Sequence, residues 1–270
     1  MGYNFAFILQ LIQVSALSLL SMPAEWEAHE CCWMAWPCRH DLWPDIDNAR
    51  QAYAKVANTI AAFEPVRMLA RRDDIKQARA LLTGDIEIID CEIDDSWTRD
   101  TAPTFVLSEE NDSKELVAID WRFNGWGEKF VPYQQDAKMA KRIAELINVP
   151  CISSNLTAEG GAIHTNGEDT LLTTRQCLLN QNRNPGWTQE SIEQELLKHL
   201  GGKQVLWLDR GLEDDHTDGH IDELACFVSA KHLLMLDTDD EKDVNYCTLK
   251  RNQDIIRASQ SCDGDSFNIT

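Results

Sequence analysis

The sequence predicts a single α/β domain, because short apolar strands alternate with amphipathic helices along most of its 270 residues. Apolar residues recur at helical spacing over residues 45–63 and again over 137–147. β-branched and apolar runs such as 86–91 have the length of buried strands. No Pro-, Ser- or Gly-rich linker divides the chain, so we expect one folded domain that begins at about residue 22.

The predicted elements follow one another in a mixed order, and no internal repeat is visible in the sequence. The best-marked helix is 189–200, because Thr188 is a good N-cap and Gly201 and Gly202 end the helix. In chain order, we expect a helix at 45–63, a strand at 66–70, a helix at 73–82, strands at 86–91, 104–107 and 116–119, helices at 137–147 and 189–200, strands at 205–208, 221–228 and 233–236, and a helix at 244–258.

The charge of the chain narrows its class of ligand. Its formal net charge is −20, which makes nucleic acid an unsuitable partner because phosphate binding requires clustered Lys and Arg. The same negative field attracts a cationic ligand, although an acidic surface can also serve solubility alone. Nine cysteines occur without any C-x-x-C pair, and this odd, scattered set is typical of reduced thiols in the cytoplasm.

The first 21 residues differ in composition from the rest of the chain. Residues 5–20 are apolar and uncharged, but the run is short for a membrane span and no Lys or Arg precedes it. Two interpretations remain open: a weak export signal, or an upstream extension outside the working protein. We therefore divide the chain into an apolar leader or extension at 1–21 and a folded domain at 22–270, with no membrane contact expected for the domain.

Polar residues gather in three loops at the ends of apolar segments, at 94–101, 159–164 and 213–222. Each loop alone is equally well explained as a solvated turn, and the paired glycines of 159–164 can make a turn or let the backbone approach a ligand. His220 and Asp222 lie two residues apart at the start of a predicted strand, so their side chains are expected on one face. Together the loops indicate carboxylates and a histidine that converge on a cation such as a guanidinium.

Metal binding is the rival chemistry. His216 and His220 have the i, i+4 spacing of a zincin helix, but Thr217 stands where that motif has Glu, and Gly219 interrupts the helix. A second set of possible ligands lies near the N-terminus, where neighbouring Trp and Pro residues indicate packing instead. This set comprises His29, Cys31, Cys32, Cys38 and His40. We therefore predict no metal site.

Several long motifs resemble those of agmatine deiminases and of the related bacterial-type peptidylarginine deiminases. They are MPAEWEAHE (22–30), WMAWP (33–37), DDSWTRDTAPTF (94–105), WRFNGWGEKF (121–130), EGGAIHTNGE (159–168), LLTTRQCLLNQNRNPG (171–186) and DGHIDELACF (218–227). The resemblance implies a pentein fold, in which five ββαβ-like modules surround a pseudo-fivefold axis. It also implies hydrolysis of agmatine to N-carbamoylputrescine and ammonia without a cofactor, for putrescine synthesis, and a possible homodimer.

The resemblance also implies the roles of individual residues. Asp100 and Asp222 would hold the guanidinium, His220 would act as general acid and base, and Glu159 would orient the site. Trp97 would line the pocket. His216 stands where these proteins usually carry an acidic residue for the distal amine of agmatine, so the C-terminal arginine of a peptide is an alternative substrate.

The end of the chain departs from the family pattern. In the family the nucleophilic cysteine lies near the C-terminus in a Gly-rich segment, whereas this sequence ends at Asn268-Ile269-Thr270 without such a segment. We therefore expect a domain that lacks its C-terminal module and is catalytically incomplete, with a non-catalytic guanidine-binding protein as the alternative. Cys226, six residues after His220 on the same predicted strand, is a weak substitute for the nucleophile.

Overall fold

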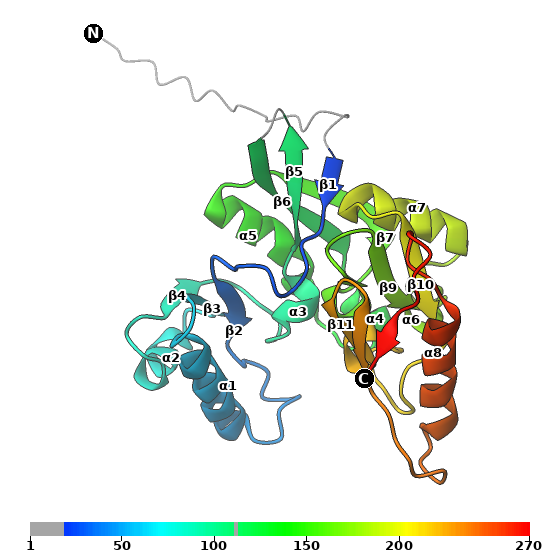
Figure 1. Ribbon diagram of the computed structural model, residues 1–270. Helices are drawn as coiled ribbons and strands as arrows, with labels where there is room; N and C mark the ends of the chain where they lie inside the picture. The colour runs from blue at the N-terminus through cyan, green and yellow to red at the C-terminus, as the bar shows by residue number, and fades with distance from the viewer. Residues whose placement is uncertain (1–18, 111–112) are drawn as a thin grey trace.

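The computed structural model describes residues 19–110 and 113–270. Four small sheets are grouped around the short helix α3 (Thr98–Thr101), and the longer helices lie toward the outside of the molecule (Figure 1). The class is mixed α/β, as the sequence predicts. In the described part of the chain, no helix is both long enough and apolar enough to cross a membrane.

Three consecutive segments share one ββαβ order. In each, two antiparallel strands are followed by a helix and then by a strand that runs parallel to the second strand. The first contains β5 (Thr104–Glu110), β6 (Ser113–Arg122), α5 (Met139–Ile147) and β7 (Cys151–Thr157). The second contains β8 (His164–Thr165), β9 (Thr170–Thr174), α7 (Gln189–Leu200) and β10 (Gln204–Leu208). The third contains β11 (Ala225–Ser229), β12 (His232–Met235), α8 (Tyr246–Ala258) and β13 (Asn268–Ile269).

A parallel unit precedes these three modules. It contains β2 (Cys32–Ala35), α1 (Ile46–Ile60), β3 (Val66–Ala70), α2 (Ile75–Leu81) and β4 (Glu87–Asp90). The strands pair in the order β2-β3-β4, and all run parallel. Trp36, Met68 and Ala57 form part of its fully buried core, which removes the apolar faces of α1 and β3 from water.

The sheet of the first module gains a strand from the N-terminal side. β1 (Leu19–Ser21) pairs antiparallel with β5, and Leu20 packs against a core shared by α7 and β6. The last three residues of the predicted apolar leader are therefore part of the fold, whereas residues 1–18 lie outside the described residues. The described fold therefore includes three residues before the boundary predicted at residue 22.

Most predicted elements are present, and the differences have clear local causes. Strand 66–70 and helix 189–200 are confirmed at both ends, including the Thr188 cap, whose side chain accepts from the backbone N–H of Ser191. The strand predicted at 221–228 is wrong. The first part of this segment is instead a 3₁₀ turn, η3 (Ile221–Glu223), in which the backbone N–H of Leu224 donates to the carbonyl of Ile221 at 3.0 Å. The strand β11 begins only at Ala225.

The connections between units carry short helices that meet near the centre of the molecule. α3 joins β4 to β5, η2 (Gly160–Ala162) joins β7 to β8, and η3 joins β10 to β11. α3 packs against η2, and η2 packs against η3. We call these three connections the seams. Because each seam carries one of the polar loops singled out in the sequence, the fold brings those loops together.

Candidate functional site

The glycine Gly161 lies at the point where the three seams meet. A Cβ atom placed on Gly161 would lie 2.5 Å from His220 Nδ1, 2.7 Å from Asp222 Oδ2 and 2.8 Å from Asp100 Oδ1. Contacts of that length are not tolerated, so only glycine fits here. Two carboxylates and one imidazole thus surround a single backbone position, as the sequence predicts for these loops.

Asp100 is held by two donors from different parts of the chain. The backbone N–H of Gly161 donates to Oδ1 at 2.9 Å, and the Trp126 indole N–H donates to Oδ2 at 3.0 Å. Trp126 belongs to the short helix α4 (Gly125–Glu128) in the WRFNGWGEKF motif. These bonds fix the orientation of a carboxylate whose side chain is 9% exposed.

His220 is buried between carboxylates on both sides of its ring. Its Nδ1 lies 3.6 Å from Asp100 Oδ1 and 4.0 Å from Asp222 Oδ1, and its Nε2 lies 3.4 Å from Glu159 Oε2. Glu159 is fully buried, and its other oxygen accepts from Arg183 Nε at 2.7 Å. The Glu159–Arg183 ion pair therefore holds the Nε2 side of the ring, and the Nδ1 side faces Asp100 and Asp222.

The electrostatics of the site follow from an excess of carboxylates in a buried place. Burial raises the pKa of Asp100 to about 6; His220 and the Gly161 N–H act to lower this pKa, and Glu159 and Asp222 act to raise it further. Burial also raises the pKa of Asp222. For His220, burial favours the neutral ring, but the Cys177 thiol, Glu159 and Asp100 outweigh it and raise the pKa to about 11. The imidazole is thus held as a cation.

Comparison with known proteins places this arrangement in a family. The family of Porphyromonas-type peptidyl-arginine deiminases matches residues 21–270. The chain belongs to this family. A Legionella pneumophila (strain Paris) protein, provisionally named an agmatine deiminase, is 44% identical over 251 residues, which cover 92% of this chain and 72% of that protein. The agmatine deiminase of Pseudomonas aeruginosa (strain LESB58) is 40% identical over 250 residues, which cover 90% and 67%.

A solved structure agrees with the fold of this deiminase-family chain. The agmatine deiminase of Enterococcus faecalis superposes with a TM-score of 0.88 at 31% identity, over 93% of this chain and 69% of that one. The pentein fold class and the agmatine deiminase resemblance predicted from the motifs are therefore confirmed. The three ββαβ segments are the modules that this fold class implies.

Three other predicted site residues of this deiminase-family chain lie around the seams rather than in contact with Gly161. Trp97 is the residue before α3; its ring stacks on Trp43 at 5.6 Å and its indole N–H donates to Asp95 at 2.9 Å. His216 is exposed, and its ring packs edge-on against Phe130 at 5.8 Å.

Cys226 does not share an element with His220. His220 is the residue before η3, whereas Cys226 lies in β11, where it pairs with Leu234. The prediction that the two share a strand is wrong, because the 3₁₀ turn separates them. Burial raises the pKa of the Cys226 thiol, with a smaller upward contribution from Glu25, so this thiol is a poor nucleophile.

Several supporting residues were not assigned a role from the sequence. Arg183 pairs with both Glu159 and Asp218, at 2.7 and 2.9 Å, and its side chain is fully buried. The Cys177 thiol lies 3.9 Å from Glu159 Oε2. Arg183 and Cys177 both fall in the LLTTRQCLLNQNRNPG motif, so the motif marked the segment, but the partners lie far away in sequence.

One trio at the site has the side chains of a metal centre. The ligand atoms of Glu159, Cys177 and His220 all lie within 4.8 Å of one another. The buried guanidinium of Arg183 is bonded to Glu159, and its positive charge disfavours a metal cation there. The His216–His220 pair considered in the sequence is not on a helix, because the two residues lie in the loop before η3.

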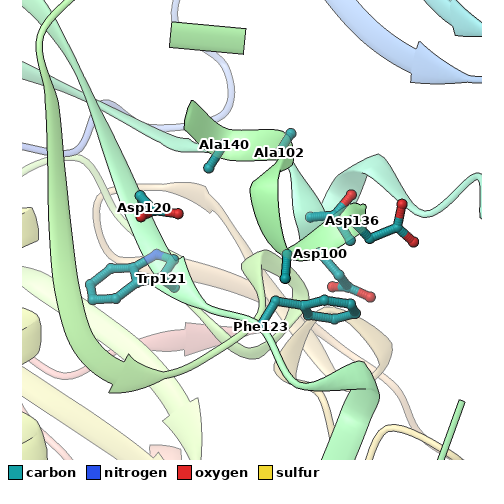
Figure 2. Close-up of a pocket in the computed structure, with 9 residues that line it drawn as sticks. Asp100, Ala102, Asp120, Trp121, Phe123, Asp136 and Ala140 are labelled. Atoms are coloured by element: carbon teal, nitrogen blue, oxygen red, sulfur yellow. The ribbon is translucent and has the colours of Figure 1, made fainter. Parts of the chain in front are cut away.

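A small cavity borders the site behind Asp100. Its volume is about 10 Å³, close to the lower limit for one water molecule. Figure 2 shows Asp120 and Trp121 on one side of it and Asp100 and Asp136 on the other. The cavity is too small for a substrate.

Proposed function

We propose that this chain binds agmatine through its guanidinium group and hydrolyses a guanidinium C–N bond to release ammonia. The observation that carries the proposal is the convergence of Asp100, Asp222 and His220 over Gly161. Agmatine is favoured as the substrate because relatives at 40% identity or more carry the agmatine deiminase name.

Asp100 and Asp222 are proposed to hold the substrate. A guanidinium is planar and presents its N–H groups as a fork, which carboxylates accept in pairs. Within the described residues, no hydrogen bond reaches the Asp222 carboxylate, whose side chain is 36% exposed. A bound guanidinium would supply the missing donors and would also offset the negative charge that raises the pKa of Asp100 and Asp222.

His220 is proposed as the general acid and base. Its imidazolium is stabilised by Glu159, and its Nδ1 side faces the two carboxylates that hold the substrate. In the reaction, a nucleophile bonds to the central carbon and the C–N bond breaks as His220 gives its proton to the departing ammonia. His220 then takes a proton from the water that replaces the nucleophile on that carbon, which releases the nucleophile and leaves the ureido product. Glu159, backed by Arg183, keeps the ring in place for that transfer.

The presence or absence of a reactive nucleophile distinguishes hydrolysis, the first proposal, from a second candidate function. Cys177 is fully buried and burial raises its pKa, so it is a thiol and not a thiolate. Cys226 has a raised pKa as well. We assign the covalent step to neither. Guanidine binding without turnover is therefore the second candidate, favoured because the thiols that flank the site in the described residues are protonated.

The remaining predicted residues concern specificity. Trp97 is proposed as a wall of the pocket, because its ring is 42% exposed beside α3. His216 is proposed to contact the distal part of the substrate, since Phe130, against which it packs, also packs on the Asp100 partner Trp126. An imidazole there is a weaker attraction for a distal amine than a carboxylate, so the C-terminal arginine of a peptide stays an alternative substrate.

Calorimetry with agmatine, together with an assay for released ammonia, tests both candidates. Asp222→Asn should weaken agmatine binding by roughly 10- to 100-fold, as expected for loss of a charged hydrogen-bond acceptor. Glu223→Gln, the neighbouring acid on η3, is the matched control and should bind normally. Saturable ammonia release supports hydrolysis, and binding without ammonia supports the second candidate. Failure to bind agmatine or an arginine peptide contradicts both.

Mass spectrometry after treatment with a haloacetamidine, which alkylates deiminase nucleophiles, addresses the thiol directly. Labelling of one cysteine that agmatine blocks would identify a working thiolate. Unprotected or absent labelling would favour guanidine binding alone.

The cytoplasm is the proposed location. All nine cysteines lie in the described residues and none forms a disulfide, which suits a reducing compartment. Homodimer formation stays a prediction.

A further inference from the structure

A second group of metal-ligating side chains lies at the edge of the β2–β3–β4 sheet, outside the deiminase site. His29 Nδ1 lies 3.2 Å from Glu64 Oε2, and the Cys32 Sγ lies 2.9 Å from Glu64 Oε1. The three ligand atoms all lie within 4.8 Å of one another. We propose that His29, Cys32 and Glu64 form a zinc site.

The backbone fixes two of the three side chains before any metal binds. Cys32 begins β2 and pairs with Val66 of β3, and its N–H donates to the carbonyl of Pro65 at 2.8 Å. Glu64 stands immediately before Pro65, and its N–H donates to the carbonyl of Ile60 at the end of α1 at 3.0 Å. The positions of Cys32 and Glu64 are therefore set by the sheet and by the end of a helix.

The chemistry of the three side chains suits Zn²⁺. Zinc takes sulfur, nitrogen and oxygen ligands together, and bonds of about 2.0–2.3 Å in a tetrahedron place the ligand atoms roughly 3.3–3.6 Å apart. The present separations of 3.2 and 2.9 Å are slightly shorter, so small side-chain rotations would open room for the ion. Three protein ligands leave the fourth position for water.

The surroundings also permit entry of the ion. The side chains of His29 and Glu64 are 46% and 26% exposed, so the group opens to solvent. The cation Arg99 acts on the Cys32 thiol, and its charge is offset by an ion pair with Glu25 at 2.6 Å. The competing explanation is a metal-free group in which the Cys32 thiol and the His29 ring both donate to Glu64.

A bound zinc ion would clip the segment before β2 to the end of α1. His29 reaches the group from the loop before β2, whereas Glu64 comes from the connection between α1 and β3. The site would thus link two segments of the fold and lie apart from the residues proposed for hydrolysis. Zinc should raise the melting temperature of the chain, because it binds only where the fold brings the ligands together.

Titration of the full chain with Zn²⁺ against a chromophoric chelator tests the proposal. We expect one zinc ion per chain, and His29→Gln, Cys32→Ser and Glu64→Gln should each weaken binding on the order of tenfold or more. Cys31→Ser, which removes the adjacent thiol, is the matched control and should bind like the parent. With Co²⁺, the thiolate-to-metal absorption should disappear in Cys32→Ser and persist in Cys31→Ser.

Melting curves with and without zinc give a second test of the proposal in case one variant folds poorly. Zinc should raise the melting temperature of the parent and of Cys31→Ser, and should leave that of His29→Gln, an exposed position, unchanged. Equal zinc binding by the parent and the three ligand variants would overturn the proposal, as would loss of binding in Cys31→Ser alone. Neither readout depends on deiminase activity, so failure of one proposal does not affect the other.

Discussion

Two groups of carboxylates lie close together in this molecule, and they differ in the hydrogen-bond donors that they have. In the first group, the carboxylate of Asp136 accepts from the backbone N–H groups of Asp94 and Asp95, in the loop before α3, at 2.8 and 3.0 Å. The carboxylate of Asp94 in turn accepts from the backbone N–H of Gln135 at 2.6 Å. At the seams, Asp222 accepts no hydrogen bond within the described residues. Asp94 and Asp136 are thus fixed by the backbone of a loop, whereas the Asp222 carboxylate, without a donor in the described residues, is available to a ligand.

The comparison extends to the partners of the remaining acids. Asp94 and Asp136 brace the chain on both sides of α3 through reciprocal backbone bonds. Asp100 accepts one backbone bond, from Gly161, but Asp100 and Glu159 also contact the ionisable or aromatic side chains of His220, Arg183 and Trp126. The loop group therefore contributes to stability and positioning, and the seam group is the one that we propose for binding and proton transfer.

The largest expected effect is at His220. His220→Asn removes the proton donor while keeping a polar side chain, so ammonia release from agmatine should fall by roughly 10²- to 10⁴-fold. The melting temperature should also fall, because the variant leaves Glu159, Asp100 and Asp222 without the buried cation that offsets their charge. Steady-state kinetics and a melting curve of the same sample check this. A variant that keeps its rate would remove His220 from the mechanism.

A smaller loss is expected at the glycine under the site. Gly161→Ala places a methyl group 2.5–2.8 Å from three polar atoms of the site. We expect agmatine affinity to fall by about 10- to 100-fold and the free energy of unfolding to fall by roughly 1–3 kcal/mol, the usual cost of overpacking. Gly84→Ala, where an added methyl meets nothing, is the control. Normal affinity in Gly161→Ala would contradict the proposed substrate position.

The loop group should affect stability before binding. Asp136→Ala leaves the buried N–H groups of Asp94 and Asp95 without acceptors, so unfolding free energy should fall by about 1–3 kcal/mol. Denaturant melts measure this. Agmatine affinity should fall less than in Gly161→Ala, and the opposite order would show that the two groups of acids do not differ as described.

The smallest expected effects are those of pH. Burial raises the pKa of Asp100 to about 6, so agmatine affinity should fall as the pH drops below 6, by at most about tenfold per pH unit for this one proton. Calorimetry at pH values between about 5 and 8 measures how agmatine affinity changes with pH. In Asp100→Asn, the slope should be absent.

The effect of Asp136 on the stability of the unliganded chain runs in the opposite direction with pH. Burial raises the pKa of Asp136 to about 7 from an ordinary value of 3.8, so its contribution is fully present below about pH 4 and is lost as the pH rises through 7. Denaturant melts across that range should show this loss in the parent. Asp136→Asn should flatten this part of the profile, and an unchanged profile would assign the titration to another group.

The sequence predicted elements well where local chemistry decides the structure. Thr188 and Gly201 bound α7 because a cap and a glycine stop act through neighbouring atoms. β7 escaped detection because Ser153, Ser154 and Asn155 give it no apolar run, although pairing with β6 makes it a strand.

The site was predictable in its residue types and not in its geometry. Asp100, Glu159, His220 and Asp222 were all assigned from motifs and are brought together at the seams. The strand predicted next to His220 was wrong, because the alternation of polar and apolar residues there fits a strand and a 3₁₀ turn equally. The module repeat was hidden because β8 has only two residues and β6 has ten.

Because the site lies between modules, ligand binding there should depend on how cooperatively the modules open. A ligand held by α3, η2 and η3 at once is linked to the opening of every module that those connections join. Bound agmatine should therefore slow amide hydrogen exchange in the sheets of β5–β6–β7, β8–β9–β10 and β11–β12 by a similar factor, rather than in one sheet alone. A bound small molecule would thus stabilise the packing of the three modules against one another.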